Sequence, residues 1–335
     1  MKAYLFFCEK SSLNDATNYY VGLIERGLNR KGIKVSKTQN TDDLCNADII
    51  VTITVKAFFL AKCKNRKAKT IFWSQGVAPE EAIMGKRNLL NYYRYICRFF
   101  LTFIALHLSD IVFLVSEEMK RHYVSMYFCK LENAIVMPCY NLSVSPVFNL
   151  KQYESPTFVY AGSSAVWQGV DLMLDVYSLV EKSIPSAHIT ILSKDKEKFE
   201  KMLALRKIKN YDIKYVKMDK LHEELHKNKY GFILRDNNVV NRVATPTKMN
   251  SYLSNYVIPI FSNTVDDFNR YINLGEFTIK AKYPLDANTI AQQVIRFEKS
   301  KHDFCQLRDY VNDVFANHYN DELYLTLFEN AIKYW

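Results

Sequence analysis

The chain has 335 residues, of which 49% are hydrophobic and 24% are charged, and its formal net charge is +10 at pH 7. A single core rarely serves more than ~250–300 residues, so we expect two domains. The 9 glycines and 8 prolines are too few for low-complexity linkers, and the positive charge favours anionic partners such as nucleic acid, phosphorylated ligands or an acidic membrane face.

The N-terminal apolar run, residues 3–8, predicts a buried strand because it is too short for the hydrophobic region of a signal peptide. Seven cysteines are scattered along the chain, with no CxxC pair and no Cys/His spacing that fits a zinc site. We therefore expect reduced thiols in a cytoplasmic protein.

The first half of the chain alternates apolar runs with segments of helical periodicity. Strands are predicted at residues 3–8, 33–35, 47–54, 70–73, 110–115 and 134–137, and helices at residues 18–29 and 117–127. The periodicity is lost from residue 140 to residue 155, so the domain boundary is placed at residue 150.

Residues 92–108, YYRYICRFFLTFIALHL, form the most apolar segment, although they include Arg94, Arg98 and His107. No segment reaches the ~18–20 uninterrupted apolar residues of a membrane span. Aromatic residues mixed with arginine fit a helix that lies in a membrane interface, but they fit a long core helix with arginines at its edges equally well.

The alternation restarts in the second half of the chain. Strands are predicted at residues 157–161, 188–192, 212–216, 231–234 and 258–261, and helices at residues 169–182, 194–206, 221–227 and within 286–335. Two successive series of strands and helices predict an α/β protein with two parallel sheets, each covered by helices. Ligands of such sheets bind at the carboxyl ends of the strands, here most simply in a cleft between the domains.

Residues 231–262 carry the most informative pattern: an apolar run, a polar loop, the sequence TPTK at residues 245–248, a short amphipathic segment and a second apolar run. This order predicts strand, loop, helix and strand. Thr245 is expected to cap the helix. Pro246 suits the first turn, because an N–H at that position has no acceptor within the helix and proline therefore loses no hydrogen bond there.

The start of this helix is a candidate anion site. Lys248 adds a positive charge near the free N–H groups of the first turn, and the preceding loop supplies Arg235 and Arg242. A phosphate or diphosphate is the ligand that suits such a place. The alternative is an ordinary helix start that binds nothing, and the local pattern leaves it open.

Two further polar turns follow predicted strands. The turn after residues 157–161 begins with Gly162 and Ser163, whose small size would let a ligand approach the backbone, although such a turn is also an ordinary connection between strand and helix. In the first half, Gln75 lies nearest the end of the strand at residues 70–73, where it could hold a substrate hydroxyl. We found no GxGxxG, P-loop or GxSxG motif, which disfavours a dehydrogenase, a nucleotide triphosphatase and a serine hydrolase.

Several stretches, in their order and spacing, carry a resemblance to a known family. They are FVYAGS at 158–163 with WQGVD at 167–171, LRDNNVVNRVATPTK at 234–248, WSQG at 73–76 with PEE at 79–81, VSEEM at 115–119 and MPCYN at 137–141. Together they resemble the bacterial nucleotide-sugar glycosyltransferases of the GT-B architecture, in the retaining, family-4-like group that builds cell-surface polysaccharides.

The resemblance implies two Rossmann-like domains that face each other across a cleft. Residues 1–150 would bind the acceptor, residues 151–310 would bind a nucleoside-diphosphate sugar, and a C-terminal helix in 311–335 would pack back on the first domain. It also implies transfer without a metal or another cofactor, so cations must offset the charge of the diphosphate.

The resemblance assigns roles to individual residues. Lys248 and either Arg235 or Arg242 match the diphosphate-binding cations, and Gln75 belongs to the catalytic set. The residues matched to nucleotide-sugar binding are Gly162, Ser163, Trp167, Gln168, Thr247 and Ser251. The backbone N–H groups near Gly162 and Ser163 would hold the diphosphate or the sugar.

The sequence departs from the family pattern at two positions. Ser251 stands where a glutamate commonly holds the ribose hydroxyls, and Tyr256 stands where a glycine is usual. A serine hydroxyl cannot make the bidentate pair of hydrogen bonds that a carboxylate makes.

The whole pattern favours a glycosyltransferase that acts on a lipid-linked glycan or a lipopolysaccharide-type acceptor. It would work from the cytoplasm on the inner face of the membrane, with peripheral contact to anionic lipid through residues 92–108. The alternative, which Ser251 favours, is a catalytically silent GT-B-like binding subunit of a glycan assembly complex. A nucleic-acid partner is disfavoured because the basic residues are scattered.

Overall fold

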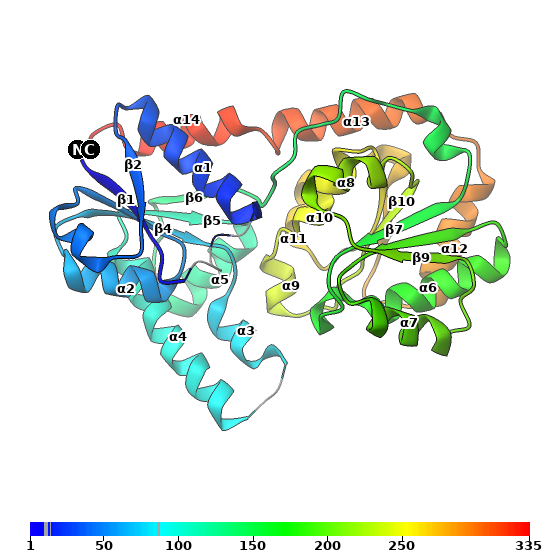
Figure 1. Ribbon diagram of the computed structural model, residues 1–335, viewed down its shortest axis with the longest axis horizontal. Coiled ribbons are helices and arrows are strands. Elements are labelled where there is room, and N and C mark those ends of the chain that lie inside the picture. The colour runs from blue at the N-terminus through cyan, green and yellow to red at the C-terminus, as the bar shows by residue number, and fades with distance from the viewer. Residues whose placement is uncertain (10–12, 14, 86–87) are drawn as a thin grey trace. The chain divides into compact units, whose positions relative to one another are not determined.

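The computed structural model describes residues 1–9, 13, 15–85 and 88–335, which form two compact units (Figure 1). The first unit consists of Met1–Asn141, Arg242–Thr245 and Tyr319–Trp335, and the second of Leu142–Asn241 and Pro246–His318. The boundary placed at residue 150 therefore falls inside the second unit, because the chain leaves the first unit after Asn141.

The first unit is built on a six-stranded parallel sheet with the strand order β2-β1-β3-β4-β5-β6. Its strands are β1 (Ala3–Phe6), β2 (Val35–Thr38), β3 (Ile49–Thr52), β4 (Lys69–Ser74), β5 (Ile111–Leu114) and β6 (Ala134–Val136). Every residue of β3 and β5 is buried, as expected for parallel strands that are covered on both faces.

In the part of this unit that the structure describes, the α-helices around the sheet are α1 (Asp15–Arg30), α2 (Val55–Lys64), α3 (Ala78–Met84), α4 (Leu89–Leu108), α5 (Glu117–Tyr127) and α14 (Asp321–Ala331). Right-handed crossovers place α1 on one face and α2, α4 and α5 on the other (Figure 1). Side chains at the N-caps fix where three of these helices begin, because Thr54, Asn88 and Ser116 accept hydrogen bonds from the first turns of α2, α4 and α5.

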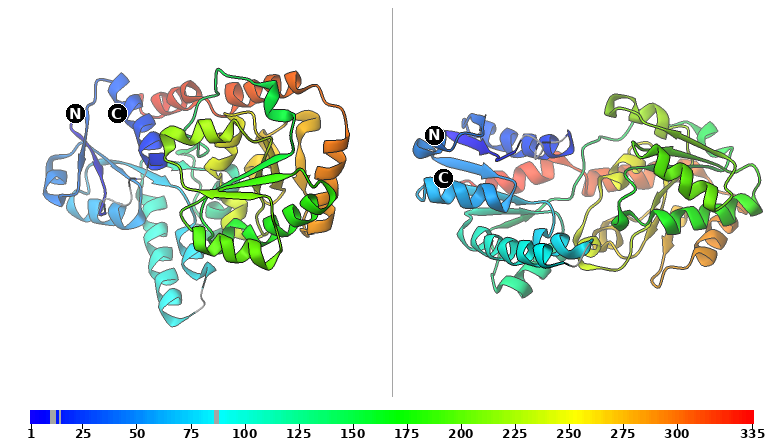
Figure 2. Two further views of the ribbon diagram at one scale, coloured as in Figure 1. Left: turned by 45° about the vertical axis from the view of Figure 1, so that its right-hand side comes forward. Right: turned by 60° about the horizontal axis from the view of Figure 1, so that its bottom comes forward.

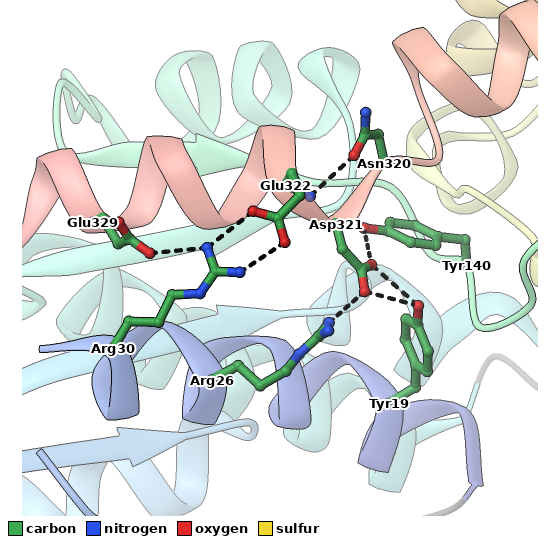
Figure 3. Close-up of polar contacts among 8 residues, drawn as sticks. All are labelled: Tyr19, Arg26, Arg30, Tyr140, Asn320, Asp321, Glu322 and Glu329. Carbon is green, nitrogen blue, oxygen red and sulfur yellow. Dashed lines mark hydrogen bonds and ion pairs between the residues drawn. The ribbon is translucent and has the colours of Figure 1, made fainter. Parts of the chain in front are cut away.

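The C-terminal helix α14 lies along α1 within the first unit (Figure 2). Gly27 of α1 leaves room for the ring of Phe328, since a Cβ at Gly27 would lie 2.4 Å from that ring. Polar contacts continue the interface (Figure 3). They join Arg26, Tyr19 and Tyr140 to Asp321, and Arg30 to Glu322 and Glu329.

The end of the chain is two helices rather than one. Helix α13 (Phe304–Asn317) belongs to the second unit, and α14 begins afresh at Asp321 in the first unit. The Asn320 side chain accepts a hydrogen bond from the Glu322 N–H and so caps α14, which explains the break.

The second unit contains a second six-stranded parallel sheet, with the strand order β12-β11-β10-β7-β8-β9. Its strands are β7 (Thr157–Ala161), β8 (His188–Leu192), β9 (Tyr211–Lys214), β10 (Tyr230–Ile233), β11 (Ile258–Ser262) and β12 (Ile279–Ala281). Its further helices are α6 (Val170–Ser183), α7 (Lys196–Leu205), α8 (Met218–Leu225), α10 (Thr247–Leu253), α11 (Asp266–Tyr271) and α12 (Ala287–Lys299). The predicted pair of helix-covered parallel sheets is confirmed.

Each sheet has one point where the strand order reverses. In the first unit β1 lies between β2 and β3 in the sheet. The chain passes from β1 to β2 on one side and then continues with β3 on the other side of β1. In the second unit β7 lies between β8 and β10 in the same way. The loops diverge at such a point beyond the carboxyl ends of the strands, which makes these two places the expected ligand sites.

Candidate functional site

At the reversal point of the second unit, two cationic side chains converge on one neutral group. Arg235 follows β10 and is 7% exposed, and Lys248 lies in the first turn of α10. The Gln168 carboxamide oxygen Oε1 accepts a hydrogen bond from Lys248 Nζ at 2.5 Å and from Arg235 Nη2 at 3.2 Å. We call Lys248 and Arg235 the cation pair.

The other contacts of the cation pair are also neutral. Arg235 Nη1 donates to the Asn241 side chain at 3.0 Å, and Lys248 Nζ lies 3.2 Å from the Tyr160 hydroxyl and 4.3 Å from the centroid of its ring. Among the residues that the structure describes, no carboxylate forms an ion pair with either cation. Both cations are thus held against groups that leave their charge uncompensated.

The electrostatics follow from this geometry. Desolvation lowers the pKa of Arg235 to about 10. Desolvation also lowers the pKa of Lys248, and the neighbouring Arg235 charge acts in the same direction. Because an anion placed between the two charges would favour the protonated form of both, the pair is electrostatically suited to a polyanionic ligand.

The glycine that follows β7 makes room for the lysine. A Cβ at Gly162 would lie 2.7 Å from both Cε and Nζ of Lys248, so any side chain there would displace the ammonium. The Gly162 N–H donates to the Leu192 carbonyl at 3.0 Å, so this one N–H is already used within the second unit, and the predicted role of the N–H groups near Gly162 and Ser163 stays a prediction. The carbonyl of the exposed Ser163 accepts a hydrogen bond from the Tyr160 hydroxyl at 2.7 Å.

The turn that carries Gln168 is held by a second glycine. Gly169 has a φ of +62°, and a Cβ on it would lie 2.2 Å from the Leu234 carbonyl oxygen, so the turn can sit directly against the end of β10. This contact places Gln168 between the two cations. The neighbouring Trp167 is 44% exposed and presents a ring on which a ligand could stack.

Helix α10 is fixed to the sheet by one aromatic residue. Gly231 in β10 leaves room for the ring of Tyr252, because a Cβ there would lie 2.6 Å from it. The Tyr252 hydroxyl accepts a hydrogen bond from the Ala161 N–H at 3.2 Å. These contacts tie α10, and with it Lys248, to the carboxyl ends of β7 and β10.

The start of α10 differs from the prediction. Pro246 is the N-cap and no side chain caps the helix, whereas the Thr245 hydroxyl accepts a hydrogen bond from the Cys139 N–H at 2.9 Å within the first unit. The predicted cap at Thr245 is therefore wrong, because its side chain serves a different backbone group. The helix is only seven residues long, so the candidate anion site rests on the cation pair rather than on the helix end.

Arg242 is not part of the cation pair. The predicted polar loop at residues 235–242 contains a short helix, α9 (Val239–Val243), and the boundary between the units runs through it. Arg242 belongs to the first unit, where its Nε lies 3.9 Å from Glu118 Oε1. A carboxylate partner distinguishes it from Arg235.

The predicted ribose-binding position lies inside the helix. Ser251 is 8% exposed, and its hydroxyl donates to the carbonyl of Thr247 at 3.1 Å, which leaves only its oxygen lone pairs for another partner. Tyr256 has a φ of +56°, in the left-handed region that favours glycine. Its hydroxyl donates to the Ser145 carbonyl at 3.1 Å, and its ring packs on Phe148, so tertiary contacts hold this backbone in place.

At the reversal point of the first unit the carboxyl ends of β1, β3 and β4 open into a cavity of about 590 Å³, which we call the first-unit cavity. Gln75 lines it as predicted for a residue at the strand end, and its Oε1 accepts a hydrogen bond from the Thr17 hydroxyl at 3.4 Å. The charged side chains around it are Glu9, Lys56, Glu81, Arg94 and Arg98.

Helix α4 borders this cavity on one side and is exposed on another. Its buried residues are Thr102, Ala105 and Leu106. Its exposed apolar residues are Leu89, Leu90, Tyr92, Tyr93, Ile96, Phe100, Phe103 and Leu108. The interpretation as a core helix is therefore wrong, and in the described part of the chain no helix is both long and apolar enough to cross a bilayer.

Some residues of these sites were not singled out from the sequence. Tyr160 lies in a strand whose apolar pattern indicated only a core position, and Asn241 lies in the segment predicted as a loop. Lys56 comes from a helix that was not predicted, and Arg98 was noted only as a charge within the apolar segment 92–108. Their one detectable signal is position, since Lys56 closely follows the strand β3.

Comparisons with known proteins agree on the architecture. No protein-family profile and no curated protein matches the chain. The structure of Anabaena HepE with UDP-glucose matches with a TM-score of 0.72 at 8% identity over 100% of both chains, and the lipopolysaccharide outer core galactosyltransferase WaaB matches with 0.69 at 13% identity over 99% of each.

A structure of a mutant of S. aureus TarM with bound UDP matches with a TM-score of 0.61 at 10% identity. That match covers 84% of this chain, but the chain spans only 55% of the length of TarM. Identities this low establish architecture alone. With its two helix-covered parallel sheets, the chain has the GT-B glycosyltransferase fold.

Proposed function

We propose that the protein is a nucleotide-sugar glycosyltransferase whose second unit binds the donor and whose first unit binds the acceptor. The observation that supports this function most directly is the cation pair, which meets only neutral partners at the reversal point of a parallel sheet. The similar HepE and TarM structures hold UDP-glucose and UDP, which are ligands of the diphosphate class.

The chemistry follows from the charge that develops during transfer. When the bond between the anomeric carbon and the diphosphate oxygen breaks, the leaving diphosphate gains negative charge. Lys248 and Arg235 would stabilise that charge, and one well-placed donor of this kind lowers a barrier by ~3–4 kcal/mol. Retention of the anomeric configuration is inferred from the family resemblance.

The remaining donor contacts come from the turns around the pair. Gln168 accepts hydrogen bonds from the two cations, and a bound diphosphate would replace it as their acceptor. We expect the Trp167 ring and Ser163, which are both exposed, to contact the base or the sugar. Thr247 and Ser251 lie on α10, where the Ser251 oxygen could accept one hydrogen bond from a ribose hydroxyl.

The acceptor would enter the first-unit cavity, where Gln75 holds the attacking hydroxyl. We propose a lipid-linked glycan or a lipopolysaccharide-type molecule as the acceptor, and an enzyme that works on the inner face of the cytoplasmic membrane. Support comes from the exposed apolar side chains of α4, combined with a net charge of +10.

A direct test is calorimetry with UDP, GDP and other nucleoside diphosphates, followed by a transfer assay with the matching sugar. Arg235→Gln should weaken diphosphate binding at least tenfold, while Arg296→Gln, an exposed change on α12, should leave it unaltered. If no nucleoside diphosphate binds the folded wild-type protein, the donor site does not exist.

The buried Ser251 favours one alternative, a catalytically silent GT-B-like binding subunit, because the Ser251 hydroxyl already donates a hydrogen bond to the Thr247 carbonyl. A silent subunit would show no transfer and no donor hydrolysis with any nucleotide sugar, even in the presence of acceptor. Turnover by the wild-type chain, abolished by Lys248→Met, would reject it.

A further inference from the structure

Tyr160 contacts both the lysine of the cation pair and the turn that follows β7. It lies in β7 and is 1% exposed. The Tyr160 hydroxyl donates to the Ser163 carbonyl at 2.7 Å and accepts a hydrogen bond from Lys248 Nζ at 3.2 Å. Because a hydroxyl has a single proton, the bond to Ser163 turns an oxygen lone pair toward the ammonium.

The ring of Tyr160 makes a second contact with the same ammonium. Lys248 Nζ lies 4.3 Å from the ring centroid, which is within the range of a cation–π interaction. A Cβ on Gly162 would lie 2.7 Å from Nζ and 3.3 Å from the Tyr160 hydroxyl, so the glycine allows this approach. One aromatic residue therefore offers both a lone pair and a ring face to the charge.

The turn on the other side of Tyr160 is held at both ends of one peptide group. The carbonyl of Ser163 accepts from Tyr160, and the N–H of Ser164 donates to Asp195 Oδ2 at 2.7 Å. The Ser164 hydroxyl donates to the same oxygen at 2.8 Å, and Lys198 Nζ donates to the Ser164 carbonyl at 2.9 Å. The acceptor of the Tyr160 proton is thus fixed, and so is the direction of the hydroxyl.

The ammonium of Lys248 depends on neutral oxygens for its hydrogen bonds. Desolvation and the nearby Arg235 charge both disfavour its protonated form, while Gln168 and Tyr160 accept from it. Gln168 lies in a turn that has no buried residue, so a ligand oxygen can replace it, whereas Tyr160 is fixed in the sheet. The other titratable groups near this contact are Tyr252, Asp195 and Lys198.

We propose that Tyr160 is a positioning residue of the donor site, which keeps the Lys248 ammonium protonated and directed at the diphosphate of the bound donor. This inference rests on the proposed function, because it concerns the donor site of the same transfer. A hydrogen bond from a charged donor stabilises the charged form, so the hydroxyl keeps the lysine protonated to higher pH than burial alone would allow. Without the hydroxyl, the lysine loses its proton earlier as the pH rises, and the diphosphate loses one of its two cations.

The variant Tyr160→Phe removes the hydroxyl and keeps the ring. Calorimetry with UDP on the full-length protein should show that the ratio of the Kd of the variant to that of the wild type rises with pH. The rise should amount to about tenfold between neutral and alkaline pH, since one hydrogen bond to a charged group contributes about that factor or more. The ratio cancels the titration of UDP itself.

The matched control is Tyr177→Phe. The Tyr177 hydroxyl is also buried in the second unit, where it lies 3.0 Å and 2.8 Å from the carbonyl oxygens of Ala187 and Asn210. Its loss should destabilise the fold but leave the pH profile of UDP affinity unchanged. A ratio for Tyr160→Phe that stays constant with pH would overturn the proposal, because a merely structural hydroxyl predicts that result.

Two measurements without a ligand test the contact itself. NMR of ¹³C-labelled lysine in the wild type should show the Hε signals of Lys248 shifted upfield by the Tyr160 ring, with Lys248→Met to assign them. This measurement needs no Tyr160 variant, so it stands even if Tyr160→Phe fails to fold. A pH titration of the same signals should reach its midpoint at a lower pH in Tyr160→Phe than in the wild type.

Unshifted Hε signals, or equal midpoints, would contradict the positioning role even in a protein that binds UDP. The opposite combination separates the two proposals. A lower midpoint in Tyr160→Phe without binding of any nucleoside diphosphate would confirm that Tyr160 holds the lysine, while refuting the donor site.

Discussion

The surroundings of Lys248 stabilise its positive charge poorly in the free protein, and an anionic ligand would stabilise that charge better. Its ammonium is desolvated against Gly162 and Tyr160, and it shares the oxygen of Gln168 with Arg235. A cation in such surroundings destabilises the free protein unless an anion compensates it. Conflict of this kind between stability and function is common at binding sites.

We expect Lys248→Met to separate these two effects. The variant should be more stable than the wild type by ~1 kcal/mol, because an apolar side chain of similar length replaces a desolvated charge. Transfer should fall by ~100-fold or more, because a charge-stabilising donor is lost. Chemical denaturation and a transfer assay measure the two quantities. A less stable variant would mean that the lysine has a structural role.

The pH dependence of binding should report the same residue. The folded-state pKa of Lys248 lies below the ordinary value of 10.5, so the lysine loses its proton earlier than an exposed lysine as the pH rises. Diphosphate affinity should therefore fall on the alkaline side below pH 10.5, and binding there should take up protons. Calorimetry in two buffers of different ionisation enthalpy measures this uptake. The difference between wild type and Lys248→Met cancels the titration of the ligand itself.

At the level of single elements, one helix end carries avoidable strain. Phe128 is the C-cap of α5, with a φ of +53° and a side chain that is 91% exposed. The left-handed conformation costs a residue with a side chain roughly 1–2 kcal/mol.

Phe128→Gly should accordingly be more stable than Phe128→Ala by ~1 kcal/mol, because both variants lose the ring but only glycine relieves the strain. Thermal or chemical unfolding of the two variants decides the matter. Equal stabilities would show that the backbone at this helix end relaxes when the ring is removed.

Helix α4 is the element that would contact a membrane. We expect Ile96→Ser with Phe100→Ser to reduce co-sedimentation with vesicles rich in anionic lipid several-fold, because both side chains are exposed and apolar. Phe99 is a poor choice for this purpose, since its ring packs on Tyr127 at 4.8 Å and its loss would disturb the fold. Unchanged co-sedimentation of the folded double variant would remove α4 as the contact.

At the level of the whole molecule, the two units have separate candidate sites, and a donor should act on the second. A nucleoside diphosphate at 100 times its Kd should stabilise the unit that binds it by ~2.7 kcal/mol. Hydrogen exchange should show the protection at the ends of β7 and β10 and in α10, whereas the amides of β3 and β4 should be unaffected. Protection confined to the first unit would indicate that the donor binds there, and it would contradict the donor site proposed for the second unit.

Much of the architecture could be read from local pattern. Apolar runs at β3, β5 and β10 predicted strands buried on both faces, and the repeated alternation predicted two parallel sheets. The end of β4 was enough to place Gln75 at the first-unit cavity. The signals failed where a distant partner decides the outcome, as at Thr245, whose hydroxyl binds the Cys139 backbone instead of capping a helix.

The amino-acid sequence by itself determined the order of most strands and helices, although it did not indicate β12 or α2. It also determined the positions of Lys248, Arg235 and Gln75 near strand ends, because these features depend on periodicity and on neighbours along the chain. Only the tertiary structure decided that Gln168 joins Lys248 to Arg235, that Arg242 pairs with Glu118, and that α14 returns to α1. Those outcomes depend on contacts between residues far apart in the chain, for which local propensity contains no information.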